Sequence, residues 1–285
     1  MLWRCRDRVF DLGSRTLVMG VVNVTPDSFS DGGRFFAPEA ALAHARRLLA
    51  EGADLLDVGG ESTRPGSQPV AAEEQWRRLA PVIGPLVGAD GAVVSVDTSS
   101  AAVAERALAA GARIVNDVTA LGDPETAGVV ARAEAGLILM HMRGTPADMQ
   151  RDPRYADAAG EVAAHLARRL EVAVAAGIAA ERVALDPGVG FGKAVRHSLE
   201  LLARLESLVA LGRPVLIGVS RKSFIGQVLD LPVGERLEGS LAATAVAVFL
   251  GARVVRTHDV AATVRAVRVA DALRAARASV QPAQA

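Results

Sequence analysis

One short pattern recurs along the chain and decides the fold. It occurs as Glu51-Gly52-Ala53-Asp54-Leu55-Leu56-Asp57, as Ala110-Gly111-Ala112-Arg113-Ile114-Val115-Asn116 and as Leu250-Gly251-Ala252-Arg253-Val254-Val255-Arg256. In each copy an Ala-rich stretch ends at a glycine, which suits the left-handed position after a helix end. A branched-aliphatic run follows and ends at a polar residue; its length and composition are those of a strand buried on both faces. Each copy therefore predicts a helix followed by a buried strand.

Counting such runs gives eight predicted strands, which start near Leu17, Asp54, Ala92, Arg113, Leu137, Val183, Pro214 and Arg253. Helical patterns alternate with them over 38–52, 73–88, 100–111, 124–135, 157–176, 197–210, 235–251 and 260–278. Strands that alternate with helices pair in parallel through right-handed crossovers. Eight units in this length predict an α/β fold, the closed (β/α)8 TIM barrel. The alternative is an open doubly wound sheet, but the first strand is not followed by the G-x-G-x-x-G turn typical of it.

The barrel pattern predicts a single domain over residues 1–285. Residues 1–16 precede the repeat, and we expect them to form a short N-terminal hairpin that closes the bottom of the barrel. Residues 279–285 are a polar, Pro-containing end for which the sequence predicts a loose tail.

Composition narrows the class of protein. Hydrophobic residues make up 51% and charged residues 22%, which supplies a sizeable core and excludes a disordered chain. Basic and acidic residues balance at 32 each, so no basic excess points to a nucleic-acid partner. The single cysteine, Cys5, cannot form an internal disulfide, which favours a reducing, cytoplasmic location. The most apolar window, 241–252, is too short to span a bilayer, so we expect no membrane partner.

Four residues of types that are rare in this chain lie at corresponding places in the repeat. Of the 32 basic residues only Lys193 and Lys222 are lysines, and Asn23 and Asn116 are the only asparagines. A chain so rich in Ala and Arg looks shaped by nucleotide bias, so residues that resisted it call for a chemical explanation. All four lie at or just after the predicted carboxyl end of a strand, where barrel enzymes carry their chemistry. This concentration favours function over chance.

The strand-end residues suit a flat, polar ligand. A carboxylate can accept two N–H groups from an aminopyrimidinone edge, while a lysine donates to the ring carbonyl. Asp97, Asn116, Asp186 and Lys222 supply these groups around one barrel mouth.

A second set suits an anion. Arg64, Arg256 and His258, with loop amides and hydroxyls, can form a phosphate site. Asn23 offers a neutral oxygen to a Mg²⁺ ion held mainly by phosphate oxygens. The histidine spacing matches no zinc motif, and no G-x-S-x-G nucleophile elbow occurs.

Plainer interpretations stand beside these. Asp117 and Asp259 can be helix caps, whereas Asp97 is followed by Thr98 and Ser99, which can do that work. His44, His165 and His197 lie in helical patterns and are interpreted as surface or packing residues. His141 and His258 lie at strand ends; His258 is the stronger candidate because Arg256 shares its face. Phe29 and Phe191 either fill loops or stack on a flat ligand.

Two long segments carry a family resemblance. Asn23-Val24-Thr25-Pro26-Asp27-Ser28-Phe29-Ser30-Asp31-Gly32-Gly33 and Asp57-Val58-Gly59-Gly60-Glu61-Ser62-Thr63-Arg64-Pro65-Gly66 resemble the two signatures of dihydropteroate synthases, the pterin-binding TIM-barrel family. Shorter matches follow in order, at 95–98, 116–117, 140–142, 186–188, 220–223 and 256–259. The resemblance covers about residues 10 to 275.

The resemblance implies a transferase of folate biosynthesis and a sulfonamide target. It would condense 6-hydroxymethyl-7,8-dihydropterin diphosphate with 4-aminobenzoate, releasing pyrophosphate and 7,8-dihydropteroate. By position, the pterin would be bound by Asp97, Asn116, Met140, Asp186, Phe191 and Lys222. The diphosphate and its Mg²⁺ would be bound by Asn23, Thr63, Arg64, Arg256 and His258, with Asn23 as the metal ligand. Aminobenzoate would be framed by Phe29, Pro65 and Ser223, with Phe191 and Lys222, once loops 25–36 and 59–72 close.

The implied mechanism begins with Mg²⁺-assisted departure of pyrophosphate, which Arg64, Arg256 and His258 stabilise. Asp97 stabilises the remaining dihydropterin cation, Lys222 holds the ring, and the aromatic amine attacks. Relatives are commonly homodimers, so a homodimer is expected. Two readings compete: a pterin-dependent methyltransferase barrel, which has no reason to need the anion site, and a pterin-binding paralogue that does not catalyse.

Overall fold

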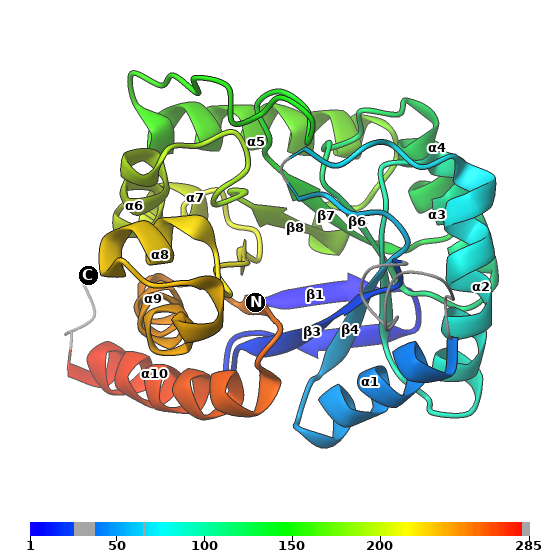
Figure 1. Cartoon of the computed structure of the whole chain (residues 1–285), viewed down its shortest axis with the longest axis horizontal. Helices are drawn as coiled ribbons and strands as arrows, with labels where there is room; N and C mark the ends of the chain where they lie inside the picture. The colour runs from blue at the N-terminus through cyan, green and yellow to red at the C-terminus, as the bar shows by residue number, and fades with distance from the viewer. Residues whose placement is uncertain (26–37, 65, 281–285) are drawn as a thin grey trace.

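A computed structural model describes residues 1–25, 38–64 and 66–280 and shows strands surrounded by helices (Figure 1). The strands are β1 (Leu2–Cys5), β2 (Arg8–Asp11), β3 (Leu17–Asn23), β4 (Leu55–Gly59), β5 (Val94–Asp97), β6 (Ile114–Asp117), β7 (Gly136–Met140), β8 (Val183–Asp186), β9 (Leu216–Ile217) and β10 (Val254–Thr257). The helices are α1 (Pro38–Ala50), α2 (Ala72–Gly88), α3 (Ala101–Ala109), α4 (Glu125–Arg132), α5 (Ala158–Ala175), α6 (Val195–Ala203), α7 (Glu206–Val209), α8 (Ser223–Leu229), α9 (Leu237–Leu250) and α10 (Val260–Val280), with short 3-10 turns η1 (Ala180–Arg182) and η2 (Val233–Glu235).

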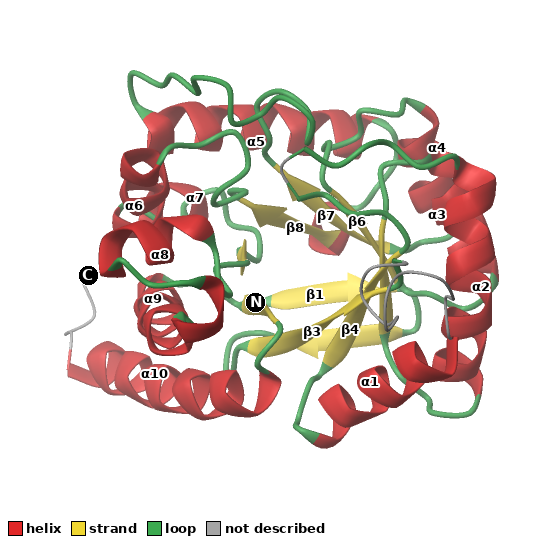
Figure 2. Ribbon diagram, viewed as in Figure 1, coloured by secondary structure: helices red, strands yellow, loops and turns green. Residues whose placement is uncertain are grey.

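Eight parallel strands form the barrel, in the order β8-β7-β6-β5-β4-β3-β10-β9. The two ends of this sheet meet through a parallel bridge between Leu185 and Val215, and the amide of Leu185 donates to the Pro214 carbonyl at 2.8 Å. The predicted (β/α)8 barrel is therefore confirmed, and the open sheet is excluded. Figure 2 shows the helices outside the strands on all sides of the view.

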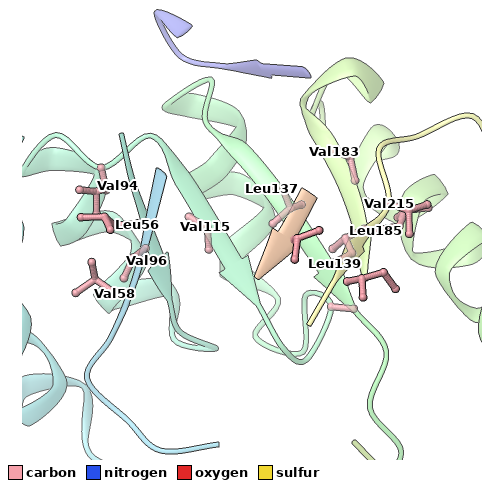
Figure 3. Close-up of a cluster of buried hydrophobic side chains, with 14 of the residues drawn as sticks. Leu56, Val58, Val94, Val96, Val115, Leu137, Leu139, Val183, Leu185 and Val215 are labelled. Atoms are coloured by element: carbon pink, nitrogen blue, oxygen red, sulfur yellow. The ribbon is translucent and has the colours of Figure 1, made fainter. Parts of the chain in front are cut away.

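Strand side chains alternate between two apolar clusters. Leu56, Val58 and the other outward residues labelled in Figure 3 pack against the helices. Leu55 and Ile114 belong to a second cluster that fills the lower barrel interior. Because successive strand residues point to opposite faces, Asp57 shares the inward side with Leu55. The same alternation sends Asp97, Asn116, Met140, Asp186 and Arg256 inward at the carboxyl ends of their strands.

The predicted N-terminal hairpin is present. β1 and β2 pair antiparallel, and Trp3 and Cys5 are fully buried with the inward cluster at the amino ends of the strands. The indole Nε1 of Trp3 donates to the Arg182 carbonyl at 2.9 Å. Burial of this apolar face stabilises the hairpin on the barrel, because an isolated two-stranded hairpin is marginal in water.

Two predicted elements differ from the structure. The helix expected over 197–210 is broken at Arg204, where ψ is 34°. The next residue, Leu205, is buried in the core. α8 was not predicted, because 220–223 was interpreted only as a strand end followed by loop. Phe224 and Ile225 are buried and anchor this short helix. α10 continues through Val280, and residues 281–285 lie outside the described part of the chain. The predicted division into one domain with a loose tail stays a prediction.

Candidate active site

A polar pocket opens where the barrel strands end. It is lined by Val21, Thr63, Asp97, Asn116, Val118, Met140, Asp186, Phe191, Gly218, Ser220, Lys222, Arg256 and His258. These residues come from all eight barrel strands or the loops that follow them, so the pocket is built by the fold as a whole. The inward alternation explains why the polar residues converge there.

An ion-pair network forms the floor of the pocket. Arg256 Nε donates to Asp57 Oδ2 at 2.6 Å, and the other arm of the guanidinium donates to Asp97 Oδ2 at 2.9 Å. Asn116 Nδ2 donates to the same Asp57 oxygen at 3.0 Å. Asp57 is fully buried, and no partner is found for its Oδ1 among the described residues. One arginine thus holds two carboxylates in a fixed arrangement, and Asp57 orients both Arg256 and Asn116.

Burial sets the charge state of the pocket. Desolvation and the nearby Asp57 carboxylate raise the pKa of Asp97 to about 7, against the lowering effect of Arg256. Burial also raises the pKa of Asp186, which Lys222 counteracts. The pKa of Lys222 falls to about 8, chiefly through burial. Near neutral pH the pocket therefore contains groups poised to change charge when a ligand arrives, as functional sites often do.

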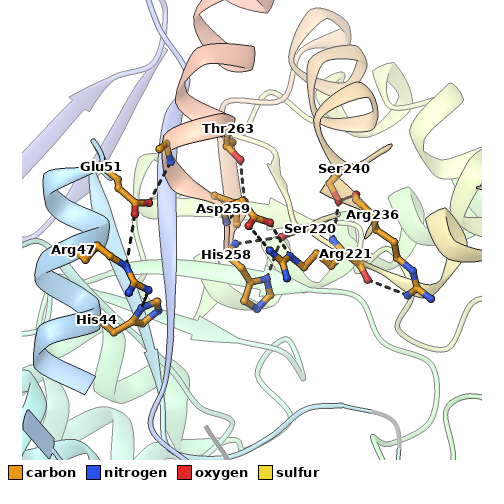
Figure 4. Close-up of polar contacts among 12 residues, drawn as sticks. His44, Arg47, Glu51, Ser220, Arg221, Arg236, Ser240, His258, Asp259 and Thr263 are labelled. Carbon is orange, nitrogen blue, oxygen red and sulfur yellow. Dashed lines mark hydrogen bonds and ion pairs between the residues drawn. The ribbon is translucent and has the colours of Figure 1, made fainter. Parts of the chain in front are cut away.

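A histidine and a serine extend the pocket from neighbouring strands. His258 follows β10, and its Nδ1 lies 3.1 Å from Ser220 Oγ, which also accepts from the His258 amide (Figure 4). Burial and the charge of Arg256 lower the pKa of His258 to about 4, so the imidazole is neutral at pH 7. Beside them, Arg221 is bound by both carboxylate oxygens of Asp259, at 2.6 and 2.9 Å. That pair fixes the loop after β9 against the start of α10.

Most of the predicted site residues meet in this pocket. It contains Thr63, Asp97, Asn116, Met140, Asp186, Phe191, Lys222, Arg256 and His258. Three predicted residues, Asn23, Arg64 and Ser223, do not line it; Arg64 and Ser223 are exposed, and Asn23 ends β3 on the inward side, in step with Val21. Phe29 and Pro65 lie outside the described residues, as does most of the loop 25–36.

Sequence reasoning missed Asp57 and Ser220 as site residues. Asp57 ends a predicted strand and opens the second family signature but was given no role, although a charged residue on the inward side of an apolar strand is a usable signal. Ser220 opens the matched segment 220–223 but was given no role, because serines are common in loops and its type alone indicates nothing. His141 and Lys193, both singled out in the sequence, do not line the pocket and contact each other instead. Asp117 is a turn former: its carboxylate accepts the amides of Thr119 and Leu121.

Metal ligands are sparse in this pocket. Among residues 1–25, 38–64 and 66–280, no group of three or more His, Cys, Asp or Glu side chains is arranged to hold a metal ion. A divalent cation there would need oxygens from a ligand, with Asn23 as a single neutral protein donor. None of the described helices is long and apolar enough to cross a membrane.

Comparison with known proteins places this fold and pocket in a family. Residues 19–258 match the family described as pterin binding enzyme. The protein is therefore one of the pterin-binding enzymes. A dihydropteroate synthase of Neisseria meningitidis serogroup C is 48% identical over 270 residues, which cover 93% of this chain and 95% of the relative.

Solved structures agree. Yersinia pestis dihydropteroate synthase in a sulfonamide drug complex superposes with a TM-score of 0.91 at 43% identity, covering 97% of this chain and all of that one. The Xanthomonas albilineans enzyme in complex with 7,8-dihydropteroate has a TM-score of 0.86 at 43% identity, with 99% and 100% coverage. Within the pterin-binding enzymes the chain thus belongs to the dihydropteroate synthases, transferases of folate biosynthesis.

Proposed function

We propose that the chain condenses 6-hydroxymethyl-7,8-dihydropterin diphosphate with 4-aminobenzoate to give 7,8-dihydropteroate and pyrophosphate. The single observation that carries the proposal is the convergence of Asp97, Asn116, Asp186 and Lys222 with Arg256 and His258 in one pocket. The first four suit a flat heterocycle and the last two suit an anion, so the pocket accommodates both halves of one substrate. The relative that contains 7,8-dihydropteroate supports the product.

The ring end is recognised by complementary polarity. Asp186 and Asp97 accept N–H groups of the aminopyrimidinone, and Lys222 donates to its carbonyl oxygen. Both carboxyls are nearly buried, at 7% exposure each, so these hydrogen bonds form away from water and are strong. Met140 and Phe191 contribute apolar contact to the faces of the ring. A Yersinia pestis relative was solved in a sulfonamide drug complex, so this protein is expected to bind sulfonamides as well.

The diphosphate end is held by cations and hydroxyls. Arg256 keeps a fixed orientation because Asp57 accepts from its Nε, and Thr63, Ser220 and His258 line the same pocket. His258 is neutral in the free protein, and the negative charge of a diphosphate favours its protonated, doubly donating form. Arg64 is exposed on the loop after β4 and can reach the anion from outside.

Mg²⁺ fits this site only as a companion of the diphosphate. Asn23 lies at the end of β3 on the inward side and would be its protein ligand, with phosphate oxygens supplying most of the coordination. This fits the absence of a multi-carboxylate metal cluster among the described residues. When bound, the cation supplies charge neutralisation to the diphosphate.

The reaction then follows from these positions. The bond between the pterin methylene carbon and the diphosphate oxygen breaks, and its electron pair leaves with pyrophosphate, which Arg256, His258 and Arg64 stabilise. The ionised Asp97 lies beside Arg256 and stabilises the cation that remains on the dihydropterin. The aromatic amine attacks the methylene, and the resulting nitrogen is acidic enough to lose its proton without a strong general base.

Further features remain proposals. A homodimer is supported by exposed apolar side chains on α9 and α10, where Val246, Val269 and Leu273 are 53%, 62% and 57% exposed. A cytoplasmic location is supported by the single cysteine.

A product assay tests the proposal directly. Purified protein is mixed with the dihydropterin diphosphate, Mg²⁺ and 4-aminobenzoate, and dihydropteroate is measured by mass spectrometry with each component omitted in turn. We expect product only when all are present. Pterin binding without product would indicate the non-catalytic paralogue or the methyltransferase reading. Calorimetry with pyrophosphate would separate those two, because only the paralogue has cause to keep the anion site.

A further inference from the structure

The loop after β8, residues 187–193, is docked tightly on residues 141–143, which follow β7. Gly188 has a φ of 64°, and a Cβ atom there would lie 2.0 Å from the His141 carbonyl oxygen. Gly192 has a φ of 62°, and a Cβ atom there would lie 2.2 Å from the Arg143 carbonyl oxygen. Only glycine permits both the dihedral and the approach. The two segments therefore form one packed unit.

Lys193 fastens this unit from within. Its side chain is buried, at 3% exposure, and Nζ lies 2.9 Å from the Phe191 carbonyl oxygen, 3.2 Å from that of His141 and 2.9 Å from His141 Nδ1. Burial lowers the pKa of Lys193 well below its usual range. In its protonated form the ammonium group has three donors, and these three acceptors can use all of them. Burial and the neighbouring Lys193 lower the pKa of His141 to about 2, so its ring stays neutral and Nδ1 can accept.

A lysine suits this place and an arginine does not. The chain has 30 arginines and two lysines, yet it keeps a lysine here. A planar guanidinium has five donors in a fixed fork, which three acceptors around one point cannot satisfy. A buried donor left without a partner is costly. The choice of residue thus follows from the geometry of the acceptors.

The docked loop carries part of the active site. The Val189 carbonyl accepts a hydrogen bond from Lys222 Nζ, and the Phe191 ring centroid lies 4.6 Å from the same nitrogen. Both Phe191 and Lys222 line the pocket. Any displacement of the loop would therefore move the ammonium group and the ring that face the ligand.

We propose that Lys193 and His141 are positioning residues, a buried clamp that holds loop 187–193 so that Phe191 and Lys222 form the wall that binds the pterin ring. The clamp touches no substrate itself. Because Lys222 binds the ring in both ground and transition states, loss of the clamp weakens substrate binding more than turnover. This inference rests on the proposed function, which supplies the identity of the ring.

The test compares Lys193→Met and His141→Leu with His141→Asn, whose side-chain oxygen can accept in place of Nδ1. In the full-length enzyme we expect the first two variants to raise KM for the dihydropterin diphosphate about tenfold, equal to about 1.4 kcal/mol. The kcat of these two variants should stay within about threefold of the parent value. In His141→Asn, KM should return to within about threefold of the parent value. Leu86→Ala in α2, a fully buried residue outside the pocket and the loop, is the control for a purely structural loss. It should lower stability without changing KM.

Calorimetric binding of 6-hydroxymethylpterin provides a second readout that needs no turnover. We expect the dissociation constants to follow the same order as KM. An unchanged affinity in both Lys193→Met and His141→Leu would overturn the clamp, and so would an equal rise in Leu86→Ala. Equal loss in His141→Asn and His141→Leu would overturn the role of Nδ1. Failure of the parent enzyme to form product would reject the proposed function, whereas the binding comparison would still decide the clamp.

Discussion

Replacing the Asp97 carboxyl should lower turnover and, as pH rises, increase the stability of the fold relative to the parent. In Asp97→Asn the ring-facing side chain keeps its size but loses its charge. The pKa of Asp97 rises from 3.8 to about 7 in the fold, mainly because the carboxyl is buried. At about 1.36 kcal/mol per pKa unit, keeping this group ionised costs the folded protein about 4 kcal/mol. The parent therefore carries a destabilising charge that its chemistry requires.

The sign of the pH dependence follows from this shift. Because the folded pKa lies above the unfolded one, the unfolded chain loses its proton first, and the parent loses stability as pH rises from about 4 through about 7. The cost grows from about 2 kcal/mol at pH 5 to about 4 kcal/mol at pH 8.5. The free energy of unfolding of Asp97→Asn, relative to that of the parent, should thus increase by about 2 kcal/mol from pH 5 to pH 8.5. Loss of the contact with Arg256 changes the stability of the variant by the same amount at both pH values.

Urea denaturation of parent and variant at the two pH values measures the stability difference, and steady-state kinetics measures turnover. We expect kcat of Asp97→Asn to fall about 10²-fold or more, because the dihydropterin cation loses its stabilising charge. Pterin affinity should change far less. The reasoning is refuted if the relative stability of the variant does not increase with pH, or if its turnover equals that of the parent.

Three other predictions address the rest of the site. The kcat/KM for the pterin substrate should follow a narrow bell with a maximum between about pH 7 and 8, because Asp97 must be ionised and Lys222 protonated; a flat profile from pH 6 to 9 would contradict these roles. Arg256→Lys should lower kcat/KM about 10²-fold, since an ammonium cannot hold two carboxylates and an anion in the same geometry. Activity within threefold of the parent would contradict this role of the guanidinium. Gly188→Ala should destabilise the fold by about 3 kcal/mol or more in urea titrations, against about 1 kcal/mol for Gly212→Ala, which has a similar φ of 70° but open space around it. Equal losses in the two variants would show that close approach at Gly188 costs nothing.

Much of the fold could be predicted because the repeat is strong. The runs at Leu55, Ile114 and Val254 each supply an inward apolar residue followed two positions later by a polar one, and this alternation determines both the core and the pocket. α8 could not be predicted in the same way, since its seven residues bury only a few apolar side chains and carry too little periodicity.

The site divides along similar lines. Asp97, Asn116 and Asp186 could be found because polar side chains at strand ends are expensive to bury and so stand out. The ion pairs that join Arg256 to Asp57 and Asp97 span 199 and 159 residues of chain, and single-sequence patterns carry no information on such distant pairing. The same limit applied to His141 and Lys193: their positions were noticed, but the direction of their side chains depends on the packing of two loops.

The N-terminal hairpin can complete its packing only after much of the barrel has been synthesised. Trp3 is made before the barrel strands that cover it, and its indole donates to the Arg182 carbonyl, 179 residues later in the chain. At roughly 5–20 residues per second, the ribosome adds that stretch in about 10 to 35 seconds. Through that interval Trp3 and Cys5 lack the surface that buries them, and they are exposed to chaperones and to other nascent chains. We therefore expect translation speed between Trp3 and Arg182 to affect the folding yield of this protein.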